Sequence, residues 1–118
     1  MKPLVSILIP AYNAGPWIAD TLKSVQAQTW PRKEIIVVDD GSRDNTLAVA
    51  QTFASAEVRV VAQKNAGASA ARNHAFRLCR GDYIQWLDAD DILDPEKISR
   101  QMVVAETCSD KKILLSST

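Results

Sequence analysis

The sequence predicts an α/β fold in which helices cover both faces of a mainly parallel sheet. Three features predict it: apolar runs short enough for strands recur along the chain, an amphipathic stretch follows each run, and the connections are short. The 118 residues suffice for one domain with a real core, which we expect to span 1–118. The expected architecture is therefore three layers, α/β/α.

The first third of the chain is expected to hold two strands and the helix between them. Leu4–Ile9 is apolar and rich in β-branched residues, which favours a buried strand. Gly15 interrupts the chain and Pro16 suits a first helical position, so we expect a helix over Pro16–Gln28. Glu34–Val38 is apolar on both faces, as strands are when helices cover the sheet.

Two helices and one strand are expected in the middle of the chain. Asp44 can cap a helix that runs to about Ser55, and Val58–Ala62 is then the third strand. Ala68–Leu78 is rich in alanine and is expected to form a helix that ends near Gly81.

The last third is expected to add a strand, a helix and the start of a further strand. Tyr83–Leu87 is the fourth apolar run. Asp94 can cap a helix and Pro95 suits its first turn, so we expect a helix from there to about Glu106. Ile113–Leu115 is expected to begin a fifth strand.

Charge and cysteine content argue against several classes of function. Lys plus Arg and Asp plus Glu are 14 each, so the net charge is zero, which argues against a nucleic-acid partner. No run approaches the roughly 18 apolar residues that span a bilayer, and we expect no signal peptide. Cys79 and Cys108 lack metal-ligand spacing and are expected to be reduced thiols, which indicates a cytoplasmic protein.

Acidic residues gather after two of the predicted strands. In a parallel sheet the ligand binds outside the carboxyl ends of the strands, and these ends carry Asp39–Asp40 and Asp88–Asp91. Single acids are explained by helix caps or solvated loops, but carboxylates this close repel one another unless a cation neutralises them. The Asp88-Ala89-Asp90 spacing, in which Ala89 leaves room for a ligand, predicts a Mg²⁺ or Mn²⁺ site that bridges carboxylate to phosphate.

The other strand ends carry groups that suit a nucleotide. Pro10–Asn13 offers backbone groups for a base, and Tyr12 is either a ring that stacks on the base or simply a half-buried residue. Asp40 can accept a hydrogen bond from a base N–H. Asn65–Ser69 opens a helix whose amides favour an anion. Arg72 either reaches a phosphate or pairs with one of the aspartates.

Histidine and tryptophan are not expected to take part in the chemistry. His74 is expected to have a structural or surface role. Trp17, Trp30 and Trp86 are expected to pack in or against the core rather than to form a sugar-stacking platform, although Trp30, which precedes Pro31, could lie exposed.

Four segments, in this order, resemble the family 2 glycosyltransferases. They read VSILIPAYN at 5–13, EIIVVDDGS at 34–42, NAGASAARN at 65–73 and GDYIQWLDADD at 81–91, and together they span nearly the whole chain. The resemblance implies a GT-A type, Rossmann-like domain that binds a nucleotide-diphospho-sugar. It also implies inverting transfer of a sugar, commonly from a UDP-sugar, to an acceptor hydroxyl with Mn²⁺ or Mg²⁺.

The resemblance also implies roles for individual residues. Asp40 matches the uracil contact, and Asp90 matches the metal ligand, with Asp88 at the ribose or the metal. The implied partners are a nucleotide-diphospho-sugar donor and a glycan or lipid-linked acceptor, and a membrane acceptor would hold the full-length protein at the membrane surface. The residues that match the nucleotide-sugar contacts are Pro10, Ala11, Tyr12, Asp40, Arg72, Asp88 and Ala89.

The chain departs from the family pattern in its length. Members of the family are considerably longer, and their general base, an Asp or Glu, lies in the second half with most of the acceptor pocket. No acid here matches that base by motif, so we expect a truncated, donor-binding half that is inactive alone. An unfinished sheet edge and apolar helix faces would favour self-association.

Other interpretations explain fewer of the motifs. A dinucleotide-binding fold needs G-x-G-x-x-G after the first strand, and a P-loop needs G-x-x-x-x-G-K-[ST]; neither occurs. An Asp-x-Asp phosphatase has its motif on an early strand, and a receiver-like signalling domain has its acid pair where Pro10 and Ala11 stand here. A non-catalytic nucleotide-sugar-binding module stays open beside the enzyme.

Overall fold

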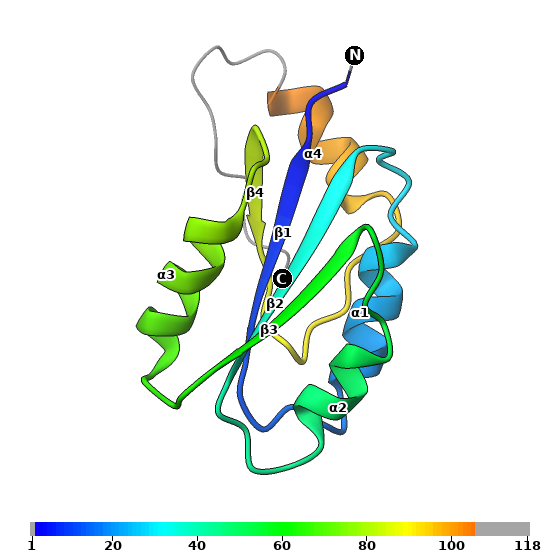
Figure 1. Cartoon of the computed structure of the whole chain (residues 1–118). Coiled ribbons are helices and arrows are strands. Elements are labelled where there is room, and N and C mark those ends of the chain that lie inside the picture. The colour runs from blue at the N-terminus through cyan, green and yellow to red at the C-terminus, as the bar shows by residue number, and fades with distance from the viewer. Residues whose placement is uncertain (1, 106–118) are drawn as a thin grey trace.

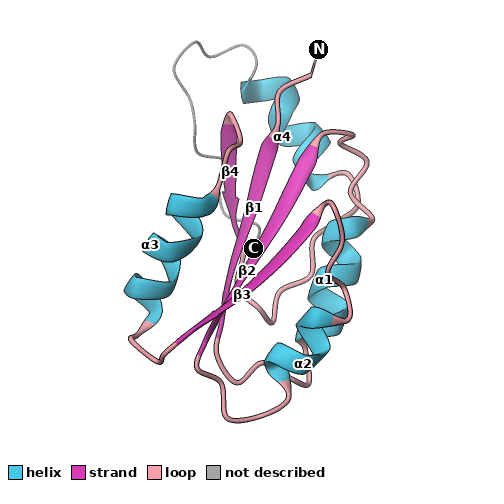
Figure 2. Ribbon diagram, in the orientation of Figure 1, coloured by secondary structure: helices cyan, strands magenta, loops and turns pink. Residues whose placement is uncertain are grey.

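The structure of the protein is a computed structural model, and the residues it describes are 2–105. In this part of the chain, parallel strands form one sheet in the order β3-β2-β1-β4, and helices lie on both of its faces (Figures 1 and 2). The predicted three-layer α/β/α architecture is therefore confirmed. In chain order the elements are β1 (Val5–Ala11), α1 (Ile18–Gln26), β2 (Lys33–Asp40), α2 (Thr46–Gln51), β3 (Val58–Gln63), α3 (Ala68–Leu78), β4 (Tyr83–Trp86) and α4 (Lys97–Ala105).

The larger core lies between the sheet and helices α1, α2 and α4. Alternate residues of β1 and β2 point into it, because successive side chains of a strand face opposite sides of the sheet. They pack against the apolar stripe of α1, and each large side chain buried in this way contributes roughly 1.5–3 kcal/mol. Its buried members on these elements include Val5, Ile7, Ile9, Ile18, Leu22, Val25, Ile35, Val37, Ala50, Ile98 and Met102.

Helix α3 covers the opposite face of the sheet. It packs with Ala71 and Ala75 against Leu8, Ile36 and Val38 of β1 and β2. Because alanine side chains are short, the helix lies close to the strands, and its first turn sits beside their carboxyl ends (Figure 1). This placement makes α3 one wall of the site described below.

The first helix begins later than the sequence predicted. Pro16 lies in a turn, and α1 starts only at Ile18, after the backbone N–H groups of Trp17 and Ile18 both donate to the carbonyl of Ala14, at 2.9 and 2.8 Å. Pro16 therefore lies two residues before the first residue of α1, in the turn that leads into the helix, rather than at the first helical position.

Helix α2 is short, and its N-cap residue is Asn45 rather than the predicted Asp44. Asp44 lies one residue earlier, where its carboxylate accepts a hydrogen bond from the backbone N–H of Thr46, at 2.9 Å. The helix ends at Gln51 rather than near Ser55.

The strands differ from the prediction at their carboxyl ends. β1 continues to Ala11, β2 to Asp40 and β3 to Gln63, whereas β4 ends at Trp86, one residue before the predicted end. Asp39 and Asp40 are therefore strand residues that pair with β3, not loop residues. Their side chains consequently point to opposite faces of the sheet.

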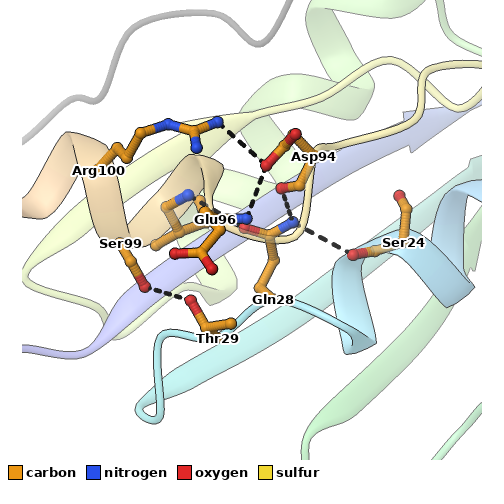
Figure 3. Close-up of polar contacts among 8 residues, drawn as sticks. Ser24, Gln28, Thr29, Asp94, Glu96, Ser99 and Arg100 are labelled. Carbon is orange, nitrogen blue, oxygen red and sulfur yellow. Dashed lines mark hydrogen bonds and ion pairs between the residues drawn. The ribbon is translucent and has the colours of Figure 1, made fainter.

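A group of polar contacts joins the start of α4 to the end of α1 (Figure 3). The side-chain amide of Gln28 donates to the carbonyl of Asp94 at 2.7 Å and accepts from the backbone N–H of Ile98 at 3.0 Å. The carboxylate of Asp94 accepts from the backbone N–H of Glu96 at 2.9 Å and from Arg100 at 3.0 Å. Asp94 thus caps the helix as predicted, although α4 begins only after Glu96.

Some predictions lie outside the described residues: the strand at Ile113–Leu115, the helix end near Glu106, and Cys108. Cys79 is a free thiol. Among residues 2–105, no helix combines the length and the apolar character needed to cross a membrane. β3 and β4 are the edges of the described sheet, and self-association through an edge stays a prediction.

Candidate functional site

A cavity of about 350 Å³ lies at the carboxyl ends of the strands, on the side of the sheet that α3 covers. Its volume is in the range of about 300–1,000 Å³ that is typical of small-molecule sites. All the residues predicted to contact a nucleotide-sugar line it, except Ala89. We call it the α3-side cavity, and its lining is Pro10, Ala11, Tyr12, Asp40, Asn65, Gly67, Ala68, Ala71, Arg72 and Asp88.

Asp40, the last residue of β2, is 4% exposed and forms part of the cavity wall. Its Oδ1 accepts hydrogen bonds from the side chain of Gln63 and from the backbone N–H of Ala66, both at 2.8 Å. Its Oδ2 accepts from the backbone N–H of Gly67 at 3.0 Å and from the side chain of Asn65 at 3.3 Å. The carboxylate therefore holds the loop between β3 and α3 against the end of β2.

These hydrogen bonds keep Asp40 ionised. Burial raises its pKa, but the hydrogen bonds from Gln63, Ala66 and Gly67 outweigh burial and hold the pKa below its ordinary value. The amides ahead of α3 were predicted to favour an anion, and the anion at Ala66 and Gly67 is this side chain of the protein. His74 Nδ1 lies 2.8 Å from the Oε1 of Gln63, so it supports the same network, in keeping with a structural role.

Asp39 belongs to the opposite face of β2 and does not line the α3-side cavity. It is buried, and its Oδ2 accepts the backbone N–H of Ser42 at 3.2 Å. Its Oδ1 has no hydrogen-bond partner among residues 2–105. The acids near this edge of the sheet thus divide into those that line the cavities or join the acidic group and one buried carboxylate, Asp39, on the other face of β2.

Asp88, Asp90 and Asp91 form a group that can hold a metal ion. One carboxylate oxygen of each lies within 4.8 Å of the others. Burial, and then the charges of Asp88 and Asp90, raise the pKa of Asp91. Mg²⁺ and Mn²⁺ prefer oxygen ligands and would relieve this repulsion. The residues therefore fit the predicted cation, and Asp91 adds a third acid to the predicted pair.

Polar side chains on α1 hold the backbone of residues 88–93, the acidic turn that carries Asp88, Asp90 and Asp91. The hydroxyl of Thr21 donates to the carbonyl of Ala89 at 2.9 Å, and the backbone N–H of Leu93 donates to the hydroxyl of Ser24 at 3.0 Å. Thr21 and Ser24 are three residues apart on α1, and Gln28 follows four residues later, just past the end of the helix, so the three continue one row of polar side chains. These polar residues were not predicted to support the site. The sequence does contain a signal for them, because they recur at helical spacing beside the apolar residues of α1.

Tyr12 and Arg72 both line the α3-side cavity with exposed side chains. Within residues 2–105, no ion pair joins Arg72 to an aspartate, and its binding of a phosphate stays a prediction. Tyr12 is 48% exposed, which is compatible with both of the interpretations offered for it.

A second cavity, of about 210 Å³, lies at the start of α1. It shares Pro10, Tyr12 and Asp88 with the α3-side cavity, so the two adjoin. The predicted site residues Ala89 and Asp90 belong to it. We call it the α1-side cavity, and its lining is Pro10, Tyr12, Asn13, Ala14, Trp17, Asp88, Ala89 and Asp90.

One of the predictions for tryptophan is wrong. Trp17 is 52% exposed and lines the α1-side cavity, so it is not a core residue. Trp30 is 4% exposed and packs in the core as predicted, where it donates its indole N–H to the carbonyl of Pro3 at 3.0 Å; the alternative of an exposed position is not realised. Trp86 packs against the core under α3, as predicted.

The chain matches a protein family described as glycosyl transferase family 2, over residues 6–110. Chondroitin synthase from Escherichia coli is 46% identical over 98 residues, which cover 81% of this chain and 14% of that protein. The putative teichuronic acid biosynthesis glycosyltransferase TuaG from Bacillus subtilis (strain 168) is 40% identical over 104 residues, which cover 86% of this chain and 41% of that protein.

Solved structures with the same fold carry nucleotide-sugars. The structure of S. aureus TarS 1–349 in complex with UDP-GlcNAc has a TM-score of 0.82 and 28% identity, over 91% of this chain and 32% of that chain. The mannosyltransferase PcManGT from Pyrobaculum calidifontis, in complex with GDP-Man and Mn²⁺, has a TM-score of 0.79 and 27% identity, over 92% of this chain and 33% of that chain.

The chain spans less than half the length of these relatives, from 14% to 41%. Within that span, the order of the motifs, the parallel sheet and the match over residues 6–110 agree with one another. The chain belongs to glycosyl transferase family 2.

Proposed function

We propose that this chain forms the donor-binding part of an inverting glycosyltransferase, which moves a sugar from a UDP-sugar to an acceptor hydroxyl. One observation carries the proposal: Asp88 lines the α3-side cavity and also belongs to the acidic group with Asp90 and Asp91. A nucleotide in that cavity would have its diphosphate beside these acids. Because the diphosphate and the carboxylates are all anionic, the arrangement needs a cation between them.

The α3-side cavity offers a contact for each part of the nucleotide. The loop Pro10–Tyr12 would hold the nucleoside, with the ring of Tyr12 stacked on the base. Asp40 would accept the N–H of uracil in exchange for the hydrogen bond from Asn65, which at 3.3 Å is the longest of the contacts to its carboxylate. Arg72 would bind phosphate, because a guanidinium forms paired, charge-assisted hydrogen bonds with phosphate oxygens.

Asp88 and Asp90 would hold Mn²⁺ or Mg²⁺, with a carboxylate oxygen of Asp91 close by. When bound, the cation supplies Lewis-acid stabilisation of the diphosphate leaving group. The chain's own contribution is to keep the ligands in place, since the hydroxyl of Thr21 fixes the carbonyl of Ala89 between them. Because these ligands are already held in position, less conformational entropy is lost when the cation binds, which favours binding.

The relatives support the classes of donor and acceptor. The TarS structure contains UDP-GlcNAc, and the PcManGT structure contains GDP-Man with Mn²⁺. Chondroitin synthase and TuaG are named for the synthesis of chondroitin and of teichuronic acid. On this basis we propose a glycan or lipid-linked acceptor in polysaccharide synthesis. We also propose a cytoplasmic protein, held at the membrane surface where the acceptor is lipid-linked.

The acids that line the described cavities leave no carboxylate for general-base catalysis. Asp40 is held by hydrogen bonds from the β3–α3 loop, and Asp88 and Asp90 belong to the proposed cation site. A general base must reach the proton of the acceptor hydroxyl. We therefore propose that the 118-residue chain binds the donor without transferring sugar at an enzymatic rate, and so behaves alone as a nucleotide-sugar-binding module.

Isothermal titration with UDP and UDP-sugars, in Mn²⁺ and in EDTA, tests the proposal. We expect binding that requires the metal, and Asp90→Ala should weaken it at least about tenfold, or ~1.4 kcal/mol. Asp20→Ala is the matched control, because Asp20 is an exposed acid in the first turn of α1 that lines neither cavity. UDP binding indifferent to both EDTA and Asp90→Ala would contradict the metal site, and no UDP binding would contradict the whole proposal.

A further inference from the structure

We propose that the α1-side cavity is a subsite for a pyranose ring and that the indole of Trp17 is its stacking surface. The proposal rests on the proposed function, because the subsite is defined relative to the cavity assigned to the nucleotide. The two cavities share Pro10, Tyr12 and Asp88, so a ligand whose nucleoside fills the first has the second directly beside it.

The stability of the fold does not explain a tryptophan at position 17. The side chain is 52% exposed, although tryptophan is on average highly buried. It is also the N-cap residue of α1 and makes no capping hydrogen bond with its side chain, at a position where Ser, Thr, Asp or Asn stabilises a helix. A residue that departs from a local rule, and whose large apolar side chain stays about half exposed, is a candidate for a functional position.

The lining of the α1-side cavity matches a sugar better than a second phosphate. A pyranose presents C–H groups on its faces and hydroxyls around its edge. Trp17 offers exposed aromatic surface for a face, and Asp88 and Asp90 can accept hydrogen bonds from hydroxyls. The described lining contains no Lys or Arg, so an additional phosphate would meet carboxylates without a matching cation from the protein.

The size of the cavity also fits one ring. Its volume of about 210 Å³ is below the range of about 300–1,000 Å³ that holds drug-sized ligands, whereas the α3-side cavity falls within that range. The ring can be the sugar of the donor or a sugar of the acceptor, because both present the same faces and hydroxyls. The choice of ligand in the experiment separates these two sources.

The test measures affinities in Mn²⁺ by isothermal titration for wild type, Trp17→Ala and Trp17→Phe. UDP alone is the reference ligand. The donor ligands are UDP-glucose, UDP-galactose, UDP-N-acetylglucosamine and UDP-N-acetylgalactosamine. The acceptor ligands are the disaccharides cellobiose, lactose and chitobiose, which are titrated with UDP already bound. We expect Trp17→Ala to leave the affinity for UDP within about twofold and to weaken the tightest sugar-bearing ligand at least about fivefold. Trp17→Phe keeps an aromatic face and should retain most of that affinity. A loss confined to the UDP-sugars assigns the ring to the donor, and a loss confined to the disaccharides assigns it to the acceptor.

Phe76→Ala is the matched control, because Phe76 is 54% exposed on α3 and lines neither cavity. In wild type, the tryptophan emission should shift when the sugar binds, and the shift should be absent in Trp17→Phe, which retains Trp30 and Trp86; this readout is independent of how well the alanine variant folds. Equal affinity of wild type and Trp17→Ala for every sugar-bearing ligand, or an equal loss for UDP itself, would overturn the subsite. Wild type that fails to bind UDP would overturn the proposed function as well, so the two failures are distinguishable.

Discussion

The hydrogen bonds around Asp40 predict a large effect for a nearly isosteric substitution, Asp40→Asn. Asparagine keeps one carbonyl oxygen, but its amide nitrogen is a donor where the carboxylate has a second acceptor. One carboxylate oxygen accepts the backbone N–H of Ala66 and the other accepts that of Gly67. Whichever way the amide turns, a backbone N–H group then faces the NH₂ group of the asparagine.

The magnitude follows from the bonds that are lost. A hydrogen bond to a charged group contributes about 1.5–3 kcal/mol, and a buried donor left without a partner costs about 1–3 kcal/mol. Asn65 is exposed and can turn its amide to water, and the hydrogen bonds that remain lose the negative charge of their acceptor. We therefore expect the free energy of unfolding to fall by about 2–4 kcal/mol, which in a domain of this size lowers Tm by roughly 8–16 °C.

Urea unfolding followed by circular dichroism measures this difference. Asp82→Asn is the matched control, because Asp82 is exposed and its carboxylate accepts one hydrogen bond among residues 2–105, from the backbone N–H of Leu4 at 3.0 Å. We expect the control to change the free energy of unfolding by about 1 kcal/mol or less. If Asp40→Asn lies within about 0.5 kcal/mol of wild type, a typical range for surface substitutions, the carboxylate does not hold the β3–α3 loop as argued.

Three further predictions concern pH, charge and backbone conformation. Folding lowers the pKa of Asp40, so its contribution to stability is present above its unfolded pKa of about 3.9 and is lost as pH falls through the folded value. The difference in the free energy of unfolding between wild type and Asp40→Asn should therefore shrink below about pH 4. A difference that does not change with pH would contradict a stabilising role for the ionised carboxylate. The pH dependence of stability has the opposite sign for Asp91. Folding raises the pKa of Asp91, so its negative charge destabilises the metal-free fold as pH rises through the folded pKa. Asp91→Asn should therefore raise Tm in EDTA and reduce the rise in Tm that Mn²⁺ causes, whereas a lower Tm in EDTA would count against the charge repulsion. Gly41 has a φ of 70°, and a Cβ there would lie 2.7 Å from the backbone nitrogen of Asn65, whereas Gly67, with a φ of 100°, has open space around it. In thermal unfolding, Gly67→Ala should cost about 1–3 kcal/mol of backbone strain alone. Gly41→Ala should cost more than the roughly 1–2 kcal/mol of left-handed backbone strain, because the contact adds to it, and a loss of about 1 kcal/mol or less would argue against the contact.

The sequence was sufficient for the class of the fold and for the residues near the site. Apolar runs of strand length followed by amphipathic stretches are local signals, so they predicted every strand and helix of the described chain in the correct order. The motif residues could be placed at the carboxyl ends of the strands, because a parallel sheet brings those ends to one edge. Six of the predicted nucleotide-sugar residues accordingly line one cavity: Pro10, Ala11, Tyr12, Asp40, Arg72 and Asp88.

Element boundaries and the partners of individual side chains depended on contacts between distant segments. β2 extends through Asp40 because it pairs with β3 as far as Gln63, and this extension sends Asp39 and Asp40 to opposite faces. The partners of Asp40 are more than twenty residues away in the sequence, and no local pattern reveals them. Hydrogen-bond partners are set by the register of the strands and by the docking of α3.

The exposure of the tryptophans shows the same division between local and tertiary information. Composition alone favours a buried position for Trp17 and Trp30 alike, because tryptophan is large and mostly apolar. Trp30 follows that preference, whereas Trp17 stands at the start of α1, where its side chain lines the α1-side cavity and stays 52% exposed. A linear pattern encodes which residues are apolar, but how much of each side chain meets solvent is determined by the segments that pack against it.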